Sequence, residues 1–196
     1  MTRASAIRPL LLLLLALGGC NQPPAPRPAL GDVHFTSEPP IELDVRRIEI
    51  VPRYQPGSDP SHVEERPPLA LPHVAENWAS DRLRAAGTQG VGVATITDAS
   101  VTETKLATDQ SLSGMLTRQR DTRYDASVAI SVEIRDDRGI VVRQAMASAQ
   151  RSTTTVEGTT LDERDRILYQ LETDVMADLD RELDRQIRDH FGYYVR

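Results

Sequence analysis

The sequence of 196 residues is short of several residue types, and each shortage argues against a class of protein. A single cysteine rules out an internal disulfide. Four histidines leave little room for histidine-based metal or acid–base chemistry. Basic residues number 23 against 29 acidic ones, for a net charge of −6, which disfavours nucleic-acid binders because these carry a basic face. Apolar residues at 39% argue against wholesale disorder.

The chain also lacks the patterns that mark common active sites. It contains no His-Glu-x-x-His, no Cys-x-x-Cys and no Gly-x-Ser-x-Gly sequence. The Gly-Val-Gly run at 90–92 leads into a predicted strand instead of joining a strand to a helix, so it does not fit a dinucleotide-binding loop. The pairs His62 with Glu64 and His73 with Glu76 lack a third convergent ligand. We therefore predict no enzyme, with no catalytic residue, no metal and no cofactor.

The first twenty residues have the layout of an export signal. Arg3 and Arg8 form a short cationic region, and residues 10–17 form an unbroken apolar run of eight. That run is far shorter than the ~20 residues that a membrane-spanning helix needs. It closes with a Leu-Gly-Gly-Cys sequence at 17–20, and Cys20 is the cysteine of the chain.

This segment resembles the bacterial lipoprotein signal, in which an aliphatic residue and two small residues precede the cysteine. The resemblance implies that a diacylglyceryl group is attached to Cys20 through its sulfur and that the signal is cut between Gly19 and Cys20. Two or three acyl chains then make a lasting anchor, whereas one chain holds only marginally. The alternative is a plain secretory signal with a chance cysteine after the cleavage site. In the enterobacterial sorting rule, an aspartate directly after the cysteine retains a lipoprotein in the inner membrane. This chain has Asn21 at that position, so the resemblance favours the outer membrane, with the protein on its periplasmic side.

The rest of the chain divides into a proline-rich tether over 20–40 and a single domain over 41–196, after a signal over 1–19. Hydrophobic periodicity predicts strands over 41–51, 91–106, 124–134 and 140–155, and helices over 74–86 and 161–191. A one-residue slip at Arg46–Arg47 predicts a bulge in the first strand. Thr160 and Glu163 form a capping box for the last helix, which Gly192 should end.

These elements predict an α+β fold, with a small, mostly antiparallel sheet of about four strands and two helices packed on one face. The sequence at 136–139, Asp-Asp-Arg-Gly, predicts a hairpin turn between two of the strands. The strand over 140–155 carries small alanine side chains, which would let a helix approach closely. Trp78 should anchor the first helix on the sheet; the alternative is a hot spot for a partner.

Two segments are candidate contact surfaces. In the last helix the apolar residues recur every four positions and wind by about 160° around the axis, so one flat sheet should not cover both ends. We therefore predict that an apolar surface faces a partner, formed by Leu183, Ile187, Phe191, Tyr193 and Tyr194. The alternative is that the irregular segment 52–72 wraps this half of the helix.

The second candidate surface is the loop over 108–123. We predict that the tip of this loop contacts lipid headgroups or a partner; the alternative is a mobile loop with no role. That tip comprises Leu112, Met115 and Leu116.

The order of elements behind a lipoprotein signal is similar to that of the auxiliary lipoproteins of ABC-type transport systems and of lipopolysaccharide assembly. The likeness is carried by the Trp-Ala-Ser sequence at 78–80, the strand that Tyr124 begins, the turn at 136–139 and the closing helix. It implies a non-enzymatic accessory subunit with an envelope protein partner, held to the membrane by the lipid on Cys20. Two alternatives stay open: a structural lipoprotein that braces an envelope complex, and a periplasmic carrier of a lipid or small ligand.

Overall fold

The computed structural model of the protein describes residues 30–66, 68–109, 111 and 118–196. Gly19, Cys20, Leu112, Met115 and Leu116, on which the anchor and loop predictions rest, lie outside the described residues. The elements in chain order are β1 (Ile41–Leu43), β2 (Ile48–Pro52), α1 (Leu71–Arg82), β3 (Leu83–Ala85), β4 (Val91–Lys105), β5 (Arg120–Arg135), β6 (Val141–Val156), α2 (Leu161–Phe191) and the short 3₁₀ helix η2 (Gly192–Tyr194).

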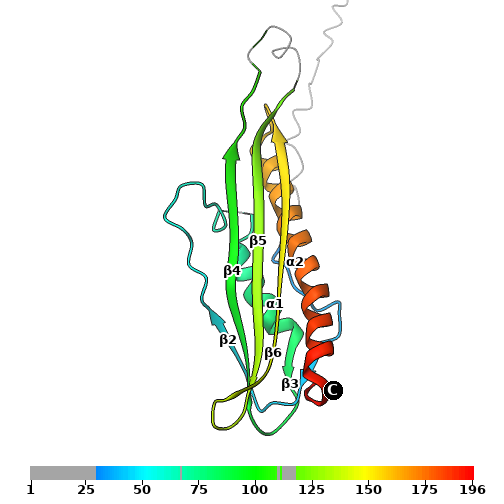
Figure 1. Cartoon of the computed structure of the whole chain (residues 1–196). Helices are drawn as coiled ribbons and strands as arrows, with labels where there is room; N and C mark the ends of the chain where they lie inside the picture. The colour runs from blue at the N-terminus through cyan, green and yellow to red at the C-terminus, as the bar shows by residue number, and fades with distance from the viewer. Residues whose placement is uncertain (1–29, 67, 110, 112–117) are drawn as a thin grey trace, which may run out of the picture.

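A four-stranded sheet and two helices make up most of the molecule (Figure 1). The strand order is β2-β4-β5-β6, in which β4, β5 and β6 are antiparallel and β2 runs parallel to β4. The three long strands have 15 or 16 residues, so they extend for about 50 Å. β1 and β3 form a second, parallel pair. This arrangement confirms the predicted α+β fold.

The predicted first strand is two strands in two different sheets. β1 pairs with β3, whereas β2 pairs with β4. Between them the Val45 amide donates to Leu43 O at 2.7 Å, which bends the chain, and Arg46 and Arg47 follow the bend. The slip in the hydrophobic alternation at Arg46–Arg47 therefore marks a change of sheet, and the prediction of a bulge within one strand was wrong.

α1 begins three residues before the predicted start at 74 and ends four residues before the predicted end at 86. It ends at Arg82, and the next three residues form β3, because β1 offers them a backbone partner. Trp78 is fully buried, and its Nε1 donates to Asp180 Oδ1 of α2 at 2.8 Å. The tryptophan therefore holds α1 against α2, and its burial leaves it no surface to offer a partner.

The folded domain begins before Ile41, where the sequence had placed its start. Val33 is buried, and its carbonyl accepts from Asn77 Nδ2 at 3.3 Å. The amide of Phe35 donates to Asp81 Oδ2 at 2.9 Å. These contacts with α1 make the second half of the predicted tether part of the domain.

α2 has the predicted ends. Thr160 and Glu163 exchange both hydrogen bonds of the capping box, and the helix ends at Phe191 before Gly192, whose φ of 54° suits a glycine. Along its length α2 packs on β5 and β6, and the buried alanines Ala145 and Ala147 of β6 lie beneath it. None of the described helices is long and apolar enough to cross a membrane.

The second half of α2 does not present the predicted apolar surface. Leu183, Ile187 and Phe191 are all fully buried within the monomer, so their assignment to a partner was wrong. The three side chains belong to one hydrophobic core, in which α2 packs on β5 and β6 and Trp78 of α1 binds Asp180 of α2. Of the segment 52–72, the residues 53–54 and 61–63 contact the edge of β4 instead.

Candidate functional site

The best candidate for a functional site is the end of the molecule at the bottom of Figure 1, which we call the lower end. It is formed by the turn 136–140 between β5 and β6, the loop 86–90 before β4, and residues 192–196. Gly192 turns the chain at the end of α2, and the Leu43–Val195 bridge then fixes the last residues beside β1. The Asp44 amide donates to Tyr194 O at 2.8 Å.

Two tyrosines and an arginine form the aromatic part of the lower end. The rings of Tyr193 and Tyr194 lie with centroids 4.3 Å apart and planes inclined by 30°. Arg143 of β6 places its guanidinium carbon 5.9 Å from the first ring and 5.7 Å from the second. A hydrogen bond with Tyr193 and burial raise the pKa of Tyr194 above its ordinary value. Of the predicted partner surface, these two tyrosines alone reach the outside.

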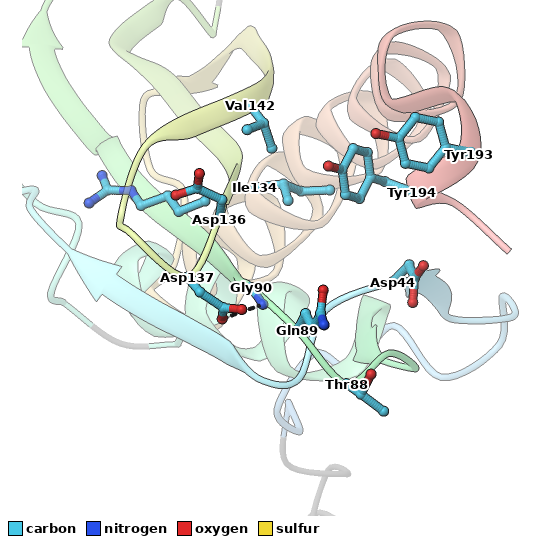
Figure 2. A pocket seen from close by; sticks show the side chains of 11 residues that line it. Asp44, Thr88, Gln89, Gly90, Ile134, Asp136, Asp137, Val142, Tyr193 and Tyr194 are labelled. Atoms are coloured by element: carbon cyan, nitrogen blue, oxygen red, sulfur yellow. Dashed lines mark hydrogen bonds between the residues drawn. The ribbon is translucent and has the colours of Figure 1, made fainter.

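A cleft of about 270 Å³ opens beside the tyrosines (Figure 2). Carboxylates of Asp44, Asp136 and Asp137 lie around it, and each of them already has a donor. Arg196 binds Asp44 at 2.7 Å, and Asp137 accepts from Arg46 and from the Gly90 amide, both at 3.1 Å. The backbone amides of Ile140 and Arg138 and the guanidinium of Arg138 donate to the Asp136 carboxylate and lower its pKa.

This arrangement is suited to recognition more than to chemistry. Its carboxylates hold the turn, the chain end and the start of β4 together, so they fix the shape of the lower end. What the lower end exposes is different: the ring of Tyr193, the aliphatic side chains of Ile140 and Val141, and the guanidinium group of Arg138. An exposed surface of aromatic, aliphatic and arginine side chains is typical of binding surfaces.

A second cluster, around Glu64, lies against the upper part of β4. Glu64 is buried and accepts hydrogen bonds from the Tyr54 hydroxyl, from His62 Nδ1 at 3.1 Å and from the Val101 amide at 3.3 Å. Burial raises the pKa of Glu64, but these hydrogen bonds outweigh it and hold the pKa below its ordinary value. The carboxylate thus fastens the segment that follows β2 to the upper part of β4.

Replacing Glu64 by glutamine should lower the free energy of unfolding by about 1–2 kcal/mol at neutral pH, because a neutral amide accepts more weakly from the same donors. Because the folded-state pKa is lowered, the stabilisation is present above the unfolded value of 4.5 and is lost as pH falls below it. Urea unfolding of parent and Glu64→Gln at pH 7 and pH 3.5 checks this. A difference that stays equal at both pH values would contradict the assignment.

His62 and Glu64 are the one predicted pair that the structure brings together, at 3.1 Å. His73 and Glu76 both lie on α1. Among the described residues, no group of three or more histidine, cysteine, aspartate or glutamate side chains could hold a metal ion.

The opposite edge of the sheet is open. Within the described part of the chain, β6 pairs with β5 alone, over 15 of its 16 residues, with Val142 left out at a register shift. On the other side of the sheet, residues 61–63 cover the upper part of β4, because the Val63 amide donates to Val101 O and the Glu103 amide to Ser61 O, both at 2.8 Å. β6 contains no proline or lysine, and its middle residues 144–150 carry no charge. Edge strands without such features readily pair with another strand.

Sequence reasoning missed several of these residues. Glu64 was weighed as a metal ligand, yet it is a structural acceptor. Arg143 and Ile140 gave no signal, because their role depends on the chain end folding back beside the turn. The burial of Glu172 in α2 could have been predicted from helical spacing. It lies four residues from Leu168 and Met176 and three from Val175, which places it on the apolar face that these buried residues form.

Comparisons with known proteins give structural neighbours only. No family model matches the chain, and no curated protein matches it. A minor lipoprotein from Acinetobacter baumannii superposes with a TM-score of 0.40 and 14% identity, over 74% of this chain and 92% of that one. Rare lipoprotein B from Shewanella oneidensis superposes with a TM-score of 0.40 and 12% identity, over 71% of this chain and 92% of that one. A DUF330 protein from Xanthomonas campestris superposes with a TM-score of 0.31 and 10% identity, over 79% of this chain and 90% of that one. The solved structures to which this chain is similar thus include two that are described as bacterial lipoproteins.

Proposed function

We propose that the protein is a lipid-anchored lipoprotein of the bacterial cell envelope and acts as a non-enzymatic accessory subunit of an envelope transport or assembly complex. The anchor is the lipid on Cys20, and the domain lies on the periplasmic side, at the outer membrane in preference to the inner one. The sequence Leu-Gly-Gly-Cys after a cationic segment and a short apolar run supports the anchor.

The open edge of β6 is the observation that carries the accessory role. A partner strand that pairs with β6 would satisfy backbone groups along up to 16 residues, which is a common way for one protein to bind another. The arginines near this edge do not block it. Arg151 binds Asp178 of α2 at 2.5 Å, and Arg143 lies over the tyrosines.

Co-purification tests the proposal. Tagged full-length protein, extracted from native membranes in mild detergent, should bring one envelope complex with it in near-equal amount. Cys20→Ala should leave the membrane fraction, because the anchor is lost. Fractionation of Cys20→Ala with membranes exactly as the parent would contradict the anchor, and recovery of the parent alone would contradict the accessory role.

A lysine on β6 locates the partner surface. Met146→Lys adds a charge to the open edge at a side chain that is 67% exposed, so it should abolish co-purification while leaving the fold intact. Leu161→Lys, at the start of α2 and 71% exposed, is the matched control and should co-purify like the parent. If both variants keep the complex, the edge of β6 is not where the partner binds.

A further inference from the structure

Exposed apolar side chains gather at the lower end of the molecule. Among the described residues, the large hydrophobic side chains that are exposed are Ile140 at 53%, Val141 at 43%, Met146 at 67%, Leu161 at 71% and Tyr193 at 72%. Ile140 and Val141 are neighbours at the turn between β5 and β6, and Arg143, two residues further along, lies over the ring of Tyr193. Ile140, Val141 and Tyr193 therefore lie at the lower end. Met146 and Leu161 lie away from it and from each other.

Arginines surround this apolar group with their charged ends outward. In the Arg138–Asp136 pair the arginine is 79% exposed and the aspartate 26%. The same order holds for Arg196 with Asp44 and for Arg135 with Glu133. In these three pairs the carboxylate is the more buried partner and the guanidinium faces the solvent, whereas Arg46 and Asp137 are exposed to a similar extent, at 46% and 52%.

These side chains match the polar surface of a lipid bilayer. Tyrosine and arginine have an apolar body and a polar tip, and proteins place such side chains at the lipid–water interface. Aliphatic side chains at the tip of a turn insert between headgroups, and outward-facing arginines attract anionic lipids. We propose that the lower end is a membrane-docking surface that rests on the headgroups of the bilayer holding the anchor. The inference rests on the lipid anchor of the proposed function.

The path of the chain supports this orientation. Val33 is held beside Asn77 of α1, and the next residue of that helix, Trp78, binds Asp180, so the N-terminal segment joins the domain near the level of Asp180. From that level α2 runs about 16 Å to Phe191 at the lower end and about 28 Å back to Leu161, at 1.5 Å per residue. The lower end is the nearer of the two. The ten residues from Cys20 to Leu30 can span up to ~35 Å, so they do not hold it away from the bilayer.

Single cysteines that carry a fluorescent label test the orientation. In the lipidated protein the sulfur of Cys20 is blocked, so an introduced cysteine is the one reactive thiol. Full-length Ile140→Cys and Tyr193→Cys report on the lower end, and Leu161→Cys and Met146→Cys are controls of comparable exposure. Each is labelled with an environment-sensitive dye and reconstituted in vesicles of phosphatidylethanolamine and phosphatidylglycerol.

The labels at 140 and 193 should shift to shorter wavelength on reconstitution, resist quenching by aqueous iodide and be quenched by lipid-attached quenchers. The labels at 161 and 146 should stay as accessible to iodide as in detergent. Equal iodide quenching at all four sites, or protection at 161 alone, would overturn the docking surface. Protection at 140 and 193 that needs a co-purified protein and is absent in vesicles would overturn it as well.

The parent protein separates this inference from the anchor on which it rests. If the parent takes up the dye at Cys20, the cysteine is not lipidated and the proposed anchor fails. If the parent stays unlabelled and the labels at 140 and 193 remain in water, the anchor stands and the docking surface alone is wrong.

Discussion

Replacing Glu172 by methionine should stabilise the protein by about 3 kcal/mol more at pH 7 than at pH 4.5. Glu172 is 2% exposed on the face of α2 that packs in the core, and within the described structure its Oε2 has no hydrogen-bond partner. Burial raises the pKa of this carboxyl from 4.5 to about 8. The side chain is therefore neutral in the folded protein at pH 7, but ionised in the unfolded chain.

The direction of the pH dependence follows from the raised pKa. Below the unfolded value of 4.5 both states are protonated, and the carboxyl adds no pH-dependent penalty. Between pH 4.5 and about 8 the unfolded state releases the proton and the folded state keeps it, so the parent loses stability as pH rises. The loss approaches about 5 kcal/mol above pH 8.

Urea unfolding of the parent and Glu172→Met from pH 4.5 to pH 8.5 measures the difference directly. Glu182→Met is the control on the same helix. Glu182 is partly exposed, and its hydrogen bond with Arg185 lowers its pKa below 4.5, so its stabilisation is already present at pH 4.5 and the difference between this variant and the parent should stay nearly flat up to pH 8.5. A difference between the parent and Glu172→Met that is flat over this range would show that Glu172 finds a partner or water in solution.

Replacing Arg82 by methionine should lower the free energy of unfolding by about 3–5 kcal/mol. Arg82 is 3% exposed at the end of α1, and its Nε donates to Asp180 Oδ1 at 2.7 Å. Its other nitrogens reach Asp184 at 3.2 Å and the carbonyl of Pro39. One guanidinium thus joins α1, α2 and the segment before β1. Its loss removes the donor of the Pro39 carbonyl and the cation that is buried against Asp180 and Asp184, which keep only Trp78 and Arg188 as donors.

Arg188→Met is the matched control. Arg188 also binds Asp184, at 2.7 Å, but it is exposed, so its loss should change the free energy of unfolding by no more than about 0.5 kcal/mol. Arg82→Lys should be nearly as damaging as Arg82→Met, because an ammonium group cannot reach three acceptors as the planar guanidinium does. Asp180→Asn combined with Arg82→Met should recover part of the loss, since the amide oxygen still accepts from Trp78. If Arg82→Met is as mild as Arg188→Met, the cluster does not hold α1 in place.

The sequence predicted the ends of helices and strands well where a particular residue type fixes the local backbone conformation. The capping box at Thr160 and Glu163, the glycine after Phe191 and the turn at 136–139 each act within a few residues. The alternation of Tyr124 to Ile134 likewise defined β5 and its buried face. These features depend on neighbours in sequence, so reading the sequence was enough to place them.

Features that depend on distant contacts were predicted less well. Both halves of the 41–51 segment alternate apolar and polar residues. Only their partner strands, β3 and β4, show that the two halves lie in different sheets. The burial of Leu183, Ile187 and Phe191 depends on the packing of α2 against β5, β6 and α1. A helical stripe that winds around its axis does not say which element will cover each part of it.

The sequence by itself determined the α+β class and the long closing helix, because periodicity and capping are local properties. The signal over 1–19 and the lipid on Cys20 stay predictions from the sequence. Tertiary structure decided which surfaces are left exposed. It buried the predicted partner face, left the edge of β6 open, and brought Ile140, Val141 and Tyr193 to one end. Exposure is a property of the whole packed chain, since a side chain is buried or free according to elements that lie far from it in sequence.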